Sequence, residues 1–416
     1  MKNLTPQFLT LMPLLAAALI AGCKEGERPA REAAPQAVPS GMRSESAGTA
    51  QGLRYAQGFS LRQQGDSAWI VVHKPWQGAS GDFTYLLVGG DSGAAAAGPP
   101  PDKAFGAGDT LVIPVPARRA VTLTTTNLRH LESIGSLDAL AGLGGGRFVC
   151  SPEVRRRMAD GRIRDVGEDT RLDLEALVSL RPDLLFTFVV GGSSDGGLAK
   201  VAETKIPTVI EGSYMEETPL GRAEWIKFTA AFFGKSRAAD SAFAEVDSAY
   251  RALAALGARA AHRPTVVVGA PFGGVWWMPS GRTYVARLLA DAGADYLWAG
   301  DTTRGSLNLD LETVLAKAGQ AEVWLNGGEW ADLDAAKAQD PRYALFRAWR
   351  EGRVWNNDAV LCEGGGRDFF ETGASRPDWV LADLIAILHP ELLPGHKFHW
   401  YRRLPAASEL PAKAAK

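Results

Sequence analysis

The sequence predicts an α/β protein with two lobes, each built on a parallel sheet, joined by one long rigid helix and preceded by a small β-rich segment. Three observations predict this fold. Strand and helix patterns alternate from Ala120 onward, as in βαβ units with a parallel sheet. An apolar stripe with helical spacing runs from Ala239 to Leu256, and the alternation restarts after it. The stretch RLDLEALVSLRPDLLFTF from Arg171 also returns as NLDLETVLAKAGQAEVWL from Asn308.

The last observation indicates an internal repeat. In both copies an aspartate (Asp173 or Asp310) caps a helix, and a glutamate (Glu175 or Glu312) lies in its first turn. An apolar helix face then leads into a strand. Helix–strand units share such features by chance, but the identical L-D-L-E at the matching point of each half, 137 residues apart, favours two lobes of the same construction.

The first 23 residues are typical of a secretory signal. Lys2 gives a positive start, residues 8–20 form an apolar run, and IAGC ending at Cys23 matches the bacterial lipobox. The run is too short to span a membrane comfortably, with an uncleaved anchor as the alternative. We therefore expect Cys23 to be acylated, which predicts a periplasmic or other extracytoplasmic lipoprotein anchored to a membrane.

The remaining boundaries follow from composition and pattern. Residues 24–52 are rich in Ala, Pro, Glu, Ser and Gly without hydrophobic periodicity, which is typical of a flexible tether. Residues 53–117 hold short β-branched and aromatic runs between Gly, Pro and Asp, which predict a small β-meander. The predicted order is signal peptide 1–23, tether 24–52, β-rich segment 53–117, first lobe 118–235, linking helix 236–260, second lobe 261–404 and tail 405–416.

Each lobe has its own series of elements. In the first lobe we expect the strands AVTLTT, ALAGLGG, DLLFTF and IPTVIE between the helices NLRHLESIG, SPEVRRRMADG and the one capped by Asp173. In the second lobe we expect the strands PTVVVGA, GGVWWMP, AEVWL and RVWNN. Its helices are GRTYVARLLADAGA, the one capped by Asp310, RYALFRAWREG and PDWVLADLIAIL.

The composition sets limits on partners and redox chemistry. A chain of 416 residues that is 46% hydrophobic and 22% charged is long enough for two or more cores. Its net charge of −2 gives no indication of nucleic acid or an anionic membrane surface as partner. An oxidising compartment allows a disulfide between Cys150 and Cys362. Because these cysteines fall in different halves of the chain, we expect buried or free thiols instead.

The order of lipobox, tether, lobe, long helix and lobe resembles the class III substrate-binding proteins of ABC importers, which serve iron–siderophore, haem and cobalamin uptake. The resemblance covers residues 118–404 and is carried by RRAVTLTTTNLRHLESIGSLDALAGLG, SPEVRRRMADGRIRDVG, LDLEALVSLRPDLLFT, SGRTYVARLLADAGADYLWAGD and LDLETVLAKA. It implies a monomer without enzyme activity or a cofactor of its own. Such a protein binds a small-molecule metal chelate between its lobes and delivers it to a permease dimer with its ATPase.

The resemblance also implies a role for the repeated glutamates. In that family a surface glutamate on each lobe docks onto arginines of the permease dimer, and the matching positions here are Glu175 and Glu312. Charged pairs of this kind set register and association rate more than affinity. The alternative is that each glutamate merely complements a helix dipole, which explains each one alone but not the matched pair.

In this architecture the ligand lies between the lobes, at strand ends and beside helix N-termini. Aromatic faces suit a flat chelate, and arginines suit its carboxylate, catecholate or phosphate groups. Because Trp276 and Trp277 are neighbours on a strand, one of them faces the cleft and the other the core. The candidate ligand-binding residues are Asn127, Arg147, Trp276, Trp277, Arg282, Glu329, Trp330, Arg367, Phe369 and Phe370.

Other functions are weighed against this one. The chain has no H-E-x-x-H or P-loop motif, although an enzyme with an unrecognised pair of carboxylates is an alternative. Six histidines are a poor supply for a bare metal receptor, so we expect no metal held by the protein itself. The arginines favour an anionic ferric siderophore-type complex over cobalamin or haem, for which His130 and Tyr284 are the candidate axial ligands. The long helix predicts small lobe movements on binding.

Overall fold

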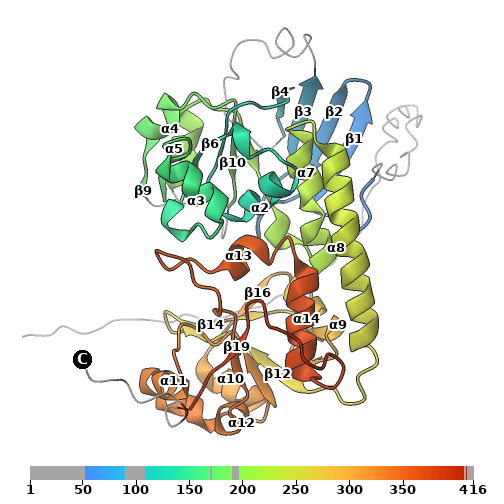
Figure 1. The fold of residues 1–416 in the computed structure, drawn as a ribbon, viewed down its shortest axis with the longest axis vertical. Coiled ribbons are helices and arrows are strands. Elements are labelled where there is room, and N and C mark those ends of the chain that lie inside the picture. The colour runs from blue at the N-terminus through green and yellow to red at the C-terminus, as the bar shows by residue number, and fades with distance from the viewer. Residues whose placement is uncertain (1–51, 90–107, 169–170, 190–195, 407–408, 410–416) are drawn as a thin grey trace, which may run out of the picture. The chain divides into compact units, whose positions relative to one another are not determined.

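The computed structural model describes residues 52–89, 108–168, 171–189, 196–406 and 409 (Figure 1). The predicted signal peptide with Cys23, the tether up to residue 51 and most of the predicted tail lie outside the described residues. Within the described ranges, no helix has the length and apolar character needed to cross a membrane.

The first lobe is built on a parallel five-stranded sheet, as predicted. Its strand order is β11-β10-β5-β6-β7. The four residues of both β6 and β10 are buried, as expected for a parallel sheet covered on both faces. The strands are β5 (Ala120–Thr122), β6 (Leu140–Leu143), β7 (Arg164–Asp165), β10 (Leu184–Thr187) and β11 (Thr208–Ile210). The helices around them are α2 (Thr126–Ser133), α3 (Pro152–Ala159), α4 (Leu174–Ser179) and α5 (Gly196–Glu203).

The second lobe repeats this plan with a sheet of order β15-β12-β17-β18-β19, in which only the edge strand β19 is antiparallel. Its strands are β12 (Thr265–Val268), β15 (Asp295–Tyr296), β17 (Val323–Leu325), β18 (Val354–Asn356) and β19 (Arg402–Arg403). Its helices are α9 (Tyr284–Asp291), α10 (Leu311–Ala318), α11 (Leu333–Gln339), α12 (Arg347–Arg350), α13 (Asp368–Thr372) and α14 (Pro377–Leu388).

Two predictions for this lobe are wrong in detail. The strand GGVWWMP is β14 (Val275–Pro279), but it belongs to a separate antiparallel sheet with β13 (Pro271–Phe272) and β16 (Ser306–Leu309). The expected helix RYALFRAWREG is interrupted at Phe346, whose backbone is extended and whose side chain is fully buried. Burying this ring outweighs the propensity of the surrounding residues to form one continuous helix.

The helix–strand repeat is present in both lobes. Asp173 accepts the backbone N–H of Ala176 at 2.8 Å and caps α4, which leads into β10. Asp310 accepts that of Thr313 at 2.7 Å and caps α10, which leads into β17. Glu175 and Glu312 both lie exposed in the first turn of their helix.

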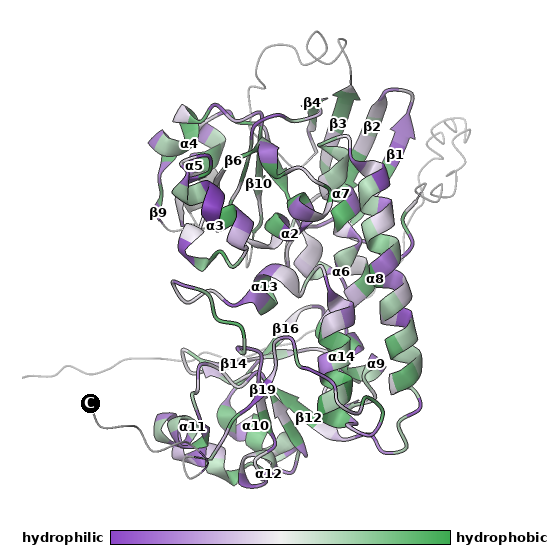
Figure 2. Ribbon diagram, in the orientation of Figure 1, coloured by the Kyte–Doolittle hydropathy of each residue, from purple (hydrophilic) through white to green (hydrophobic). Residues whose placement is uncertain are grey.

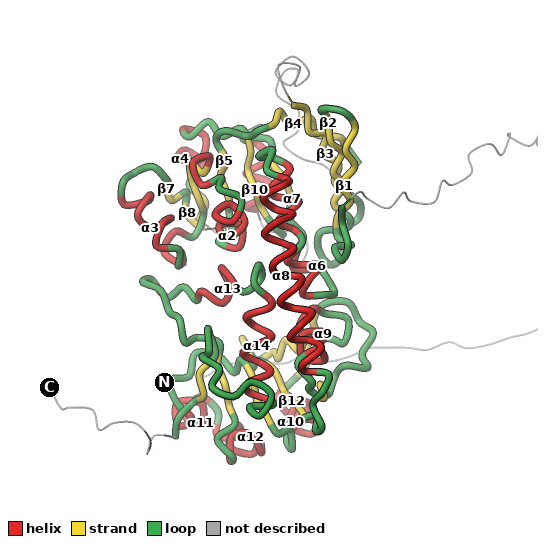
Figure 3. Tube along the Cα trace, turned by 45° about the vertical axis from the view of Figure 1, so that its right-hand side comes forward, coloured by secondary structure: helices red, strands yellow, loops and turns green. Residues whose placement is uncertain are grey.

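The predicted linking helix is α8 (Ser236–Gly257), which runs without a break between the two lobes (Figures 1 and 3). Its apolar stripe is buried at Ala239, Phe243, Val246 and Tyr250. The helix contacts α7 (Trp225–Ala231) in the first lobe and α14 in the second. Hydrophilic and hydrophobic residues alternate along it, as an amphipathic helix requires (Figure 2).

The β-rich segment forms a four-stranded sheet of order β1-β2-β3-β4. Only the first three strands form the predicted meander, because β4 joins β3 in parallel. The sheet is part of the main core: Phe59 packs on Trp225, with 4.8 Å between ring centroids. The strands are β1 (Phe59–Gln64), β2 (Ser67–Val72), β3 (Phe83–Gly89) and β4 (Thr110–Val115).

Two buried glutamates fasten the start of this segment to the first lobe. Glu224 accepts the backbone N–H groups of residues 54–56 at 2.8–3.0 Å. Glu216 accepts those of residues 57 and 58, together with the indole N–H of Trp225. The segment is therefore an integral part of the first lobe.

We predict that Glu224→Ala destabilises the fold by about 3 kcal/mol or more, because three backbone donors lose a charged acceptor. Denaturant unfolding followed by circular dichroism measures this loss. Glu203→Ala, at an exposed glutamate of the same lobe, is the control and should change stability by less than about 0.5 kcal/mol. A loss below about 1 kcal/mol for Glu224→Ala would contradict the anchoring role.

Candidate functional site

A cavity of about 590 Å³ lies between the two lobes. From the first lobe it is lined by residues 123–125 after β5, by Gly144, Gly145 and Phe148 after β6, and by Phe188 after β10. From the second lobe it is lined by Glu329 after β17 and by the loop and helix after β18. Carboxyl ends of strands from both sheets thus meet at one site, which is where parallel α/β folds place ligands.

The wall of this cavity is largely aromatic. Phe370 is 58% exposed and Phe148 is 37% exposed, which is unusual for phenylalanine and leaves their rings free to cover a ligand. Phe188 is half-buried beside them. Such faces suit a flat or bulky ligand with apolar surface.

The cationic groups at this cavity already have carboxylate partners. A guanidinium nitrogen of Arg367 lies 3.4 Å from the Glu329 carboxylate, whose side chain is 91% exposed. Arg147 does not line the cavity itself, but it lies 2.7 Å from Glu168, which does, and it stacks on Phe148, with 4.3 Å from its guanidinium carbon to the ring centroid. Because exposed ion pairs contribute little, an acidic ligand can replace either carboxylate at small cost.

A second interlobe cavity, of about 540 Å³, receives two predicted ligand-binding residues, Trp277 and Arg282, and the candidate axial ligand Tyr284. It is lined by Tyr214 from the first lobe and by Trp277, Arg282 and Tyr284 from the second. Arg282 donates to Glu217 at 2.7 Å. Trp277 is 53% exposed, so it is the outward member of the adjacent tryptophan pair. Phe369 lies beside neither cavity but lines a small pocket with Phe370.

Three predicted ligand-binding residues lie in the interior and not on a cavity wall. Trp276 is fully buried and stacks on Trp324, and its indole N–H donates to the carbonyl of Val268 at 2.8 Å. Trp330 is also buried against Trp324, because the turn after β17 folds it back into the core. Asn127 faces inward from the first turn of α2 and is fully buried.

His130 is an interior residue too. Its Nδ1 lies 3.0 Å from the Thr229 hydroxyl. Burial, aided by the charge of Arg222, lowers the pKa of His130 to about 4. It is therefore a neutral packed histidine, away from the lining of both large cavities. The lining residues of the first cavity that the sequence prediction missed include Phe148, Phe188 and Glu168, neighbours of the strand ends that it used.

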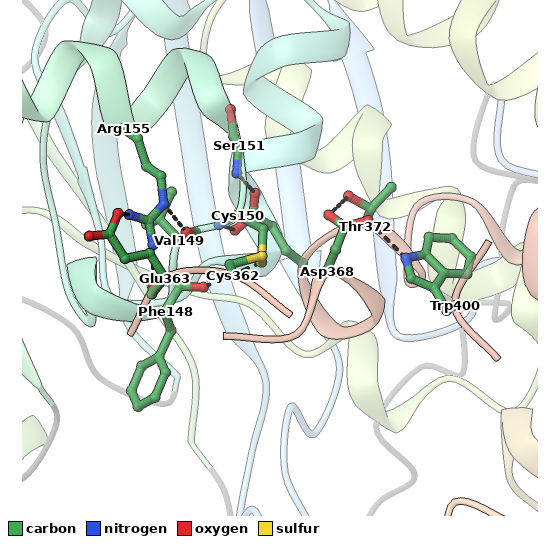
Figure 4. Close-up of a disulfide and its surroundings, with 11 residues drawn as sticks. Phe148, Val149, Cys150, Ser151, Arg155, Cys362, Glu363, Asp368, Thr372 and Trp400 are labelled. Carbon is green, nitrogen blue, oxygen red and sulfur yellow. Dashed lines mark hydrogen bonds and ion pairs between the residues drawn. A yellow bond between two sulfur atoms is a disulfide. The ribbon is translucent and has the colours of Figure 1, made fainter. Parts of the chain in front are cut away.

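The expectation of unpaired thiols is wrong, because Cys150 and Cys362 form a disulfide between the lobes (Figure 4). Cys150 precedes α3, and Cys362 lies in the loop between β18 and α13. Their separation of 212 residues along the chain does not separate them in space, with Cα atoms 5.3 Å apart. Next to this bond, Glu371 accepts the backbone N–H groups of Cys150 and Ser151 at 2.7 and 2.8 Å.

One group of side chains in the described part of the chain has the spacing of a metal site: Asp383, His396 and His399. The buried Asp383 carboxylate accepts the backbone N–H groups of residues 399–401 and lies 2.7 Å from Nε2 of His396. These hydrogen bonds give the cluster a structural role, because they hold the segment before β19 against α14. None of the three residues lines either interlobe cavity.

The comparison with known families decides the class of the protein. Residues 121–361, more than half of the chain, match the model of the periplasmic binding protein family. The chain belongs to that family. Proteins of this family bind solutes outside the cytoplasm and are not enzymes. The expectations of substrate binding and of no catalysis are therefore confirmed.

Sequence relatives and solved structures agree with this membership. Two uncharacterized lipoproteins of Methanocaldococcus jannaschii are similar: one is 29% identical over 70% of this chain and 69% of its own length, the other 26% identical over 82% and 84%. The binding-protein fold is shared with a periplasmic haem-binding protein of Pseudomonas aeruginosa (TM-score 0.54, 20% identity, 70% of this chain and 99% of that one). It is also shared with a Helicobacter pylori protein solved with Ni(II) bound (TM-score 0.52, 17% identity, 68% and 88%).

The interlobe carboxyl Glu371 gives the binding protein a pH-dependent stability. Burial raises the pKa of Glu371 from 4.5 to about 7, so the folded state holds a proton that the unfolded state releases between those pH values. The free energy of unfolding should therefore fall as pH rises from about 4.5 to about 7, by up to about 3 kcal/mol from this group.

Glu371→Gln removes the titration and keeps one acceptor oxygen for the backbone donors of Cys150 and Ser151. Denaturant unfolding at steps between pH 4.5 and 7 should show a smaller decrease in stability for this variant than for the wild type. Parallel curves for the two proteins would show that Glu371 does not titrate in this range.

Proposed function

We propose that this protein is the extracytoplasmic substrate-binding component of an ABC importer. We propose also that it binds a ferric siderophore-type complex in the first interlobe cavity, the one lined by Phe148, Arg367 and Phe370. Membership of the periplasmic binding protein family implies a permease and its ATPase as partners. The observation that carries the proposal is the cavity itself: strand ends of both lobes, three phenylalanines and an arginine surround one volume of about 590 Å³. That volume suits a ligand the size of a metal chelate.

The exchangeable ion pairs support an anionic ligand. Arg367 lines the cavity and is held by Glu329, so its guanidinium group is in place before a ligand arrives, while Arg147 is held beside the cavity by Glu168. Carboxylate, catecholate or hydroxamate oxygens of a chelate would replace the exposed Glu329 and accept charge-assisted hydrogen bonds from Arg367.

Cobalamin is the second candidate, and a different observation favours it. Because each of these arginines has a carboxylate partner, the cavity adds little net charge, and its exposed phenylalanines would cover an uncharged corrin equally well. Haem has less support at this cavity, because the described residues that line it include no histidine or tyrosine to serve as axial ligand, whereas Tyr284 lines the second interlobe cavity.

A calorimetric titration of the purified protein with a ferric hydroxamate, a ferric catecholate, ferric citrate, haem and cobalamin tests this proposal. We expect saturable binding of one ferric chelate, with a loss of tenfold or more in affinity for Arg367→Ala. Arg156→Ala, which changes a surface arginine paired within α3, is the control and should leave affinity unchanged.

Three results would change the proposal. Binding of cobalamin alone, with little effect of Arg367→Ala, would favour the second candidate. Binding of haem alone would leave the transport role but not the ligand. Full affinity of a ferric chelate for the Arg367→Ala protein would remove this arginine from the site.

The matched glutamates of α4 and α10 remain our prediction for the docking points on the permease. Both are exposed at the same point of a repeated helix, and Glu312 also pairs with Arg342 of its own lobe. Exchange of Glu312 from Arg342 to an arginine of the permease would cost little, because the pair is exposed.

The double variant Glu175→Arg, Glu312→Arg should reduce uptake by cells to background and leave the affinity for the ligand unchanged, because neither glutamate lines either of the two interlobe cavities. Uptake of the labelled chelate and its affinity for the purified protein are the two measurements. The matched control is Glu203→Arg, an exposed glutamate outside the repeat. Uptake at the wild-type level by the double variant would show that docking uses other residues.

A further inference from the structure

The interlobe disulfide lies at the rim of the proposed ligand cavity. Phe148, two residues before Cys150, lines that cavity from the first lobe, and Gly365 and Gly366, just after Cys362, line it from the second. Helix α8 joins the same lobes through the main chain, and none of its residues lines the cavity. The lobes are thus tied twice, once by a packed helix and once by a covalent bond at the cavity.

The loop that carries Cys362 fits tightly against the first lobe. The loop is closed by hydrogen bonds from the N–H of Cys362 to the carbonyl of Gly366 and from the N–H of Gly365 to the carbonyl of Cys362. A Cβ at Gly364 or Gly366 would collide with the backbone carbonyl oxygen of Arg147 or Phe148. This edge of the cavity can therefore widen only if the loop leaves the first lobe.

The other bonds across this edge are weak by comparison. Arg155 pairs with the Glu363 side chain at 3.0 Å, but that side chain is 92% exposed, and such pairs contribute little. Arg155 also donates to the backbone carbonyl of Glu363. Glu371 receives two backbone N–H groups across the edge. With the disulfide intact, opening here requires breaking a covalent bond. Without it, opening is opposed by hydrogen bonds, each with a modest net contribution, and by the packing of α13 on α2.

The disulfide is also within reach of an external thiol. Both cysteines are half-buried, and the two residues just before Cys362, Val360 and Leu361, are 41% and 61% exposed. An exposed apolar pair beside a disulfide at the surface offers a contact area for a partner protein. Disulfides persist in the extracytoplasmic compartment proposed for this protein, but accessible ones exchange with thiols.

We propose that the Cys150–Cys362 disulfide is a redox latch on the ligand cavity, and that an extracytoplasmic dithiol opens it to release the ligand. This inference rests on the proposed function of the cavity. One thiolate of the dithiol attacks one sulfur of the pair to form a mixed disulfide, and the other cysteine leaves as a thiolate. The second thiol of the partner then displaces the first cysteine. Two electrons pass to the protein, both cysteines end as thiols after protonation, and the partner leaves as a disulfide.

The first test needs no ligand. Hydrogen exchange followed by mass spectrometry is compared for the oxidised protein, the protein reduced with dithiothreitol, and the double variant Cys150→Ser, Cys362→Ser. We expect faster exchange in residues 144–151 and 361–373 of the last two forms, and unchanged exchange in β12 (Thr265–Val268), an inner strand of the second-lobe sheet, as internal control. Unchanged exchange along both segments would overturn the latch. An equal increase in β12 would also overturn it, because the bond would then only stabilise the whole fold.

The second test measures release of a ferric trihydroxamate complex by stopped-flow fluorescence. The serine double variant stands in for the reduced protein, so that no thiol reagent reaches the iron. We expect release at least tenfold faster from the variant than from the oxidised wild type, and equal rates would overturn the latch. If the complex binds to neither form, the proposed ligand is wrong, and the exchange measurement alone decides the latch.

Discussion

The packing of α8 against α7 and α14 is the constraint on which the rest of the structure depends. Phe243, Val246 and Tyr250 bury one face of this helix, and they meet helices that belong to different lobes. Bending α8 would expose that stripe, at about 25 cal/mol for each Å² of apolar surface returned to water. The helix therefore holds the two sheets so that their strand ends face one cavity, and the ligand site follows from this arrangement.

The polar groups at the cavity follow a second constraint. An arginine left half-buried without a partner is costly, yet a receptor for an acidic ligand needs that arginine in place before the ligand arrives. The structure pairs Arg367 with Glu329, whose exposed side chain would return to water if the proposed acidic ligand took its place. The same arrangement holds Arg147 against Glu168 and Phe148. The affinity for a ligand then depends on how much more strongly the guanidinium group binds the ligand than it binds its own carboxylate partner. This arrangement favours selectivity between ligands over high affinity.

Local patterns were enough to predict most of the fold. Short stretches of sequence predict the apolar stripe of α8, the capping aspartates of α4 and α10, and the buried strands of both sheets. The site was predicted in part, because strand ends locate a loop but not the direction of each side chain in it. After β6, a left-handed Gly145 begins the turn that makes Phe148, beside the predicted Arg147, a lining residue. After β17, Gly328 with φ of 130° turns Trp330 into the core and leaves Glu329 at the cavity.

The disulfide could not be predicted from this one sequence. Distance along the chain argued against the pair, but two lobes whose strand ends face each other bring loops of both halves together, so 212 residues of separation carry no weight. Gly364 and Gly366 mark the place where the two lobes come into contact. In a sequence they indicate only a flexible loop, whereas in the structure they are the positions where one lobe touches the backbone of the other. A loop with a cysteine and several glycines can therefore either form a free turn or make a close contact with the other lobe. The sequence of that loop alone does not decide between these two structures. The second cysteine, in the facing loop of the other lobe, does.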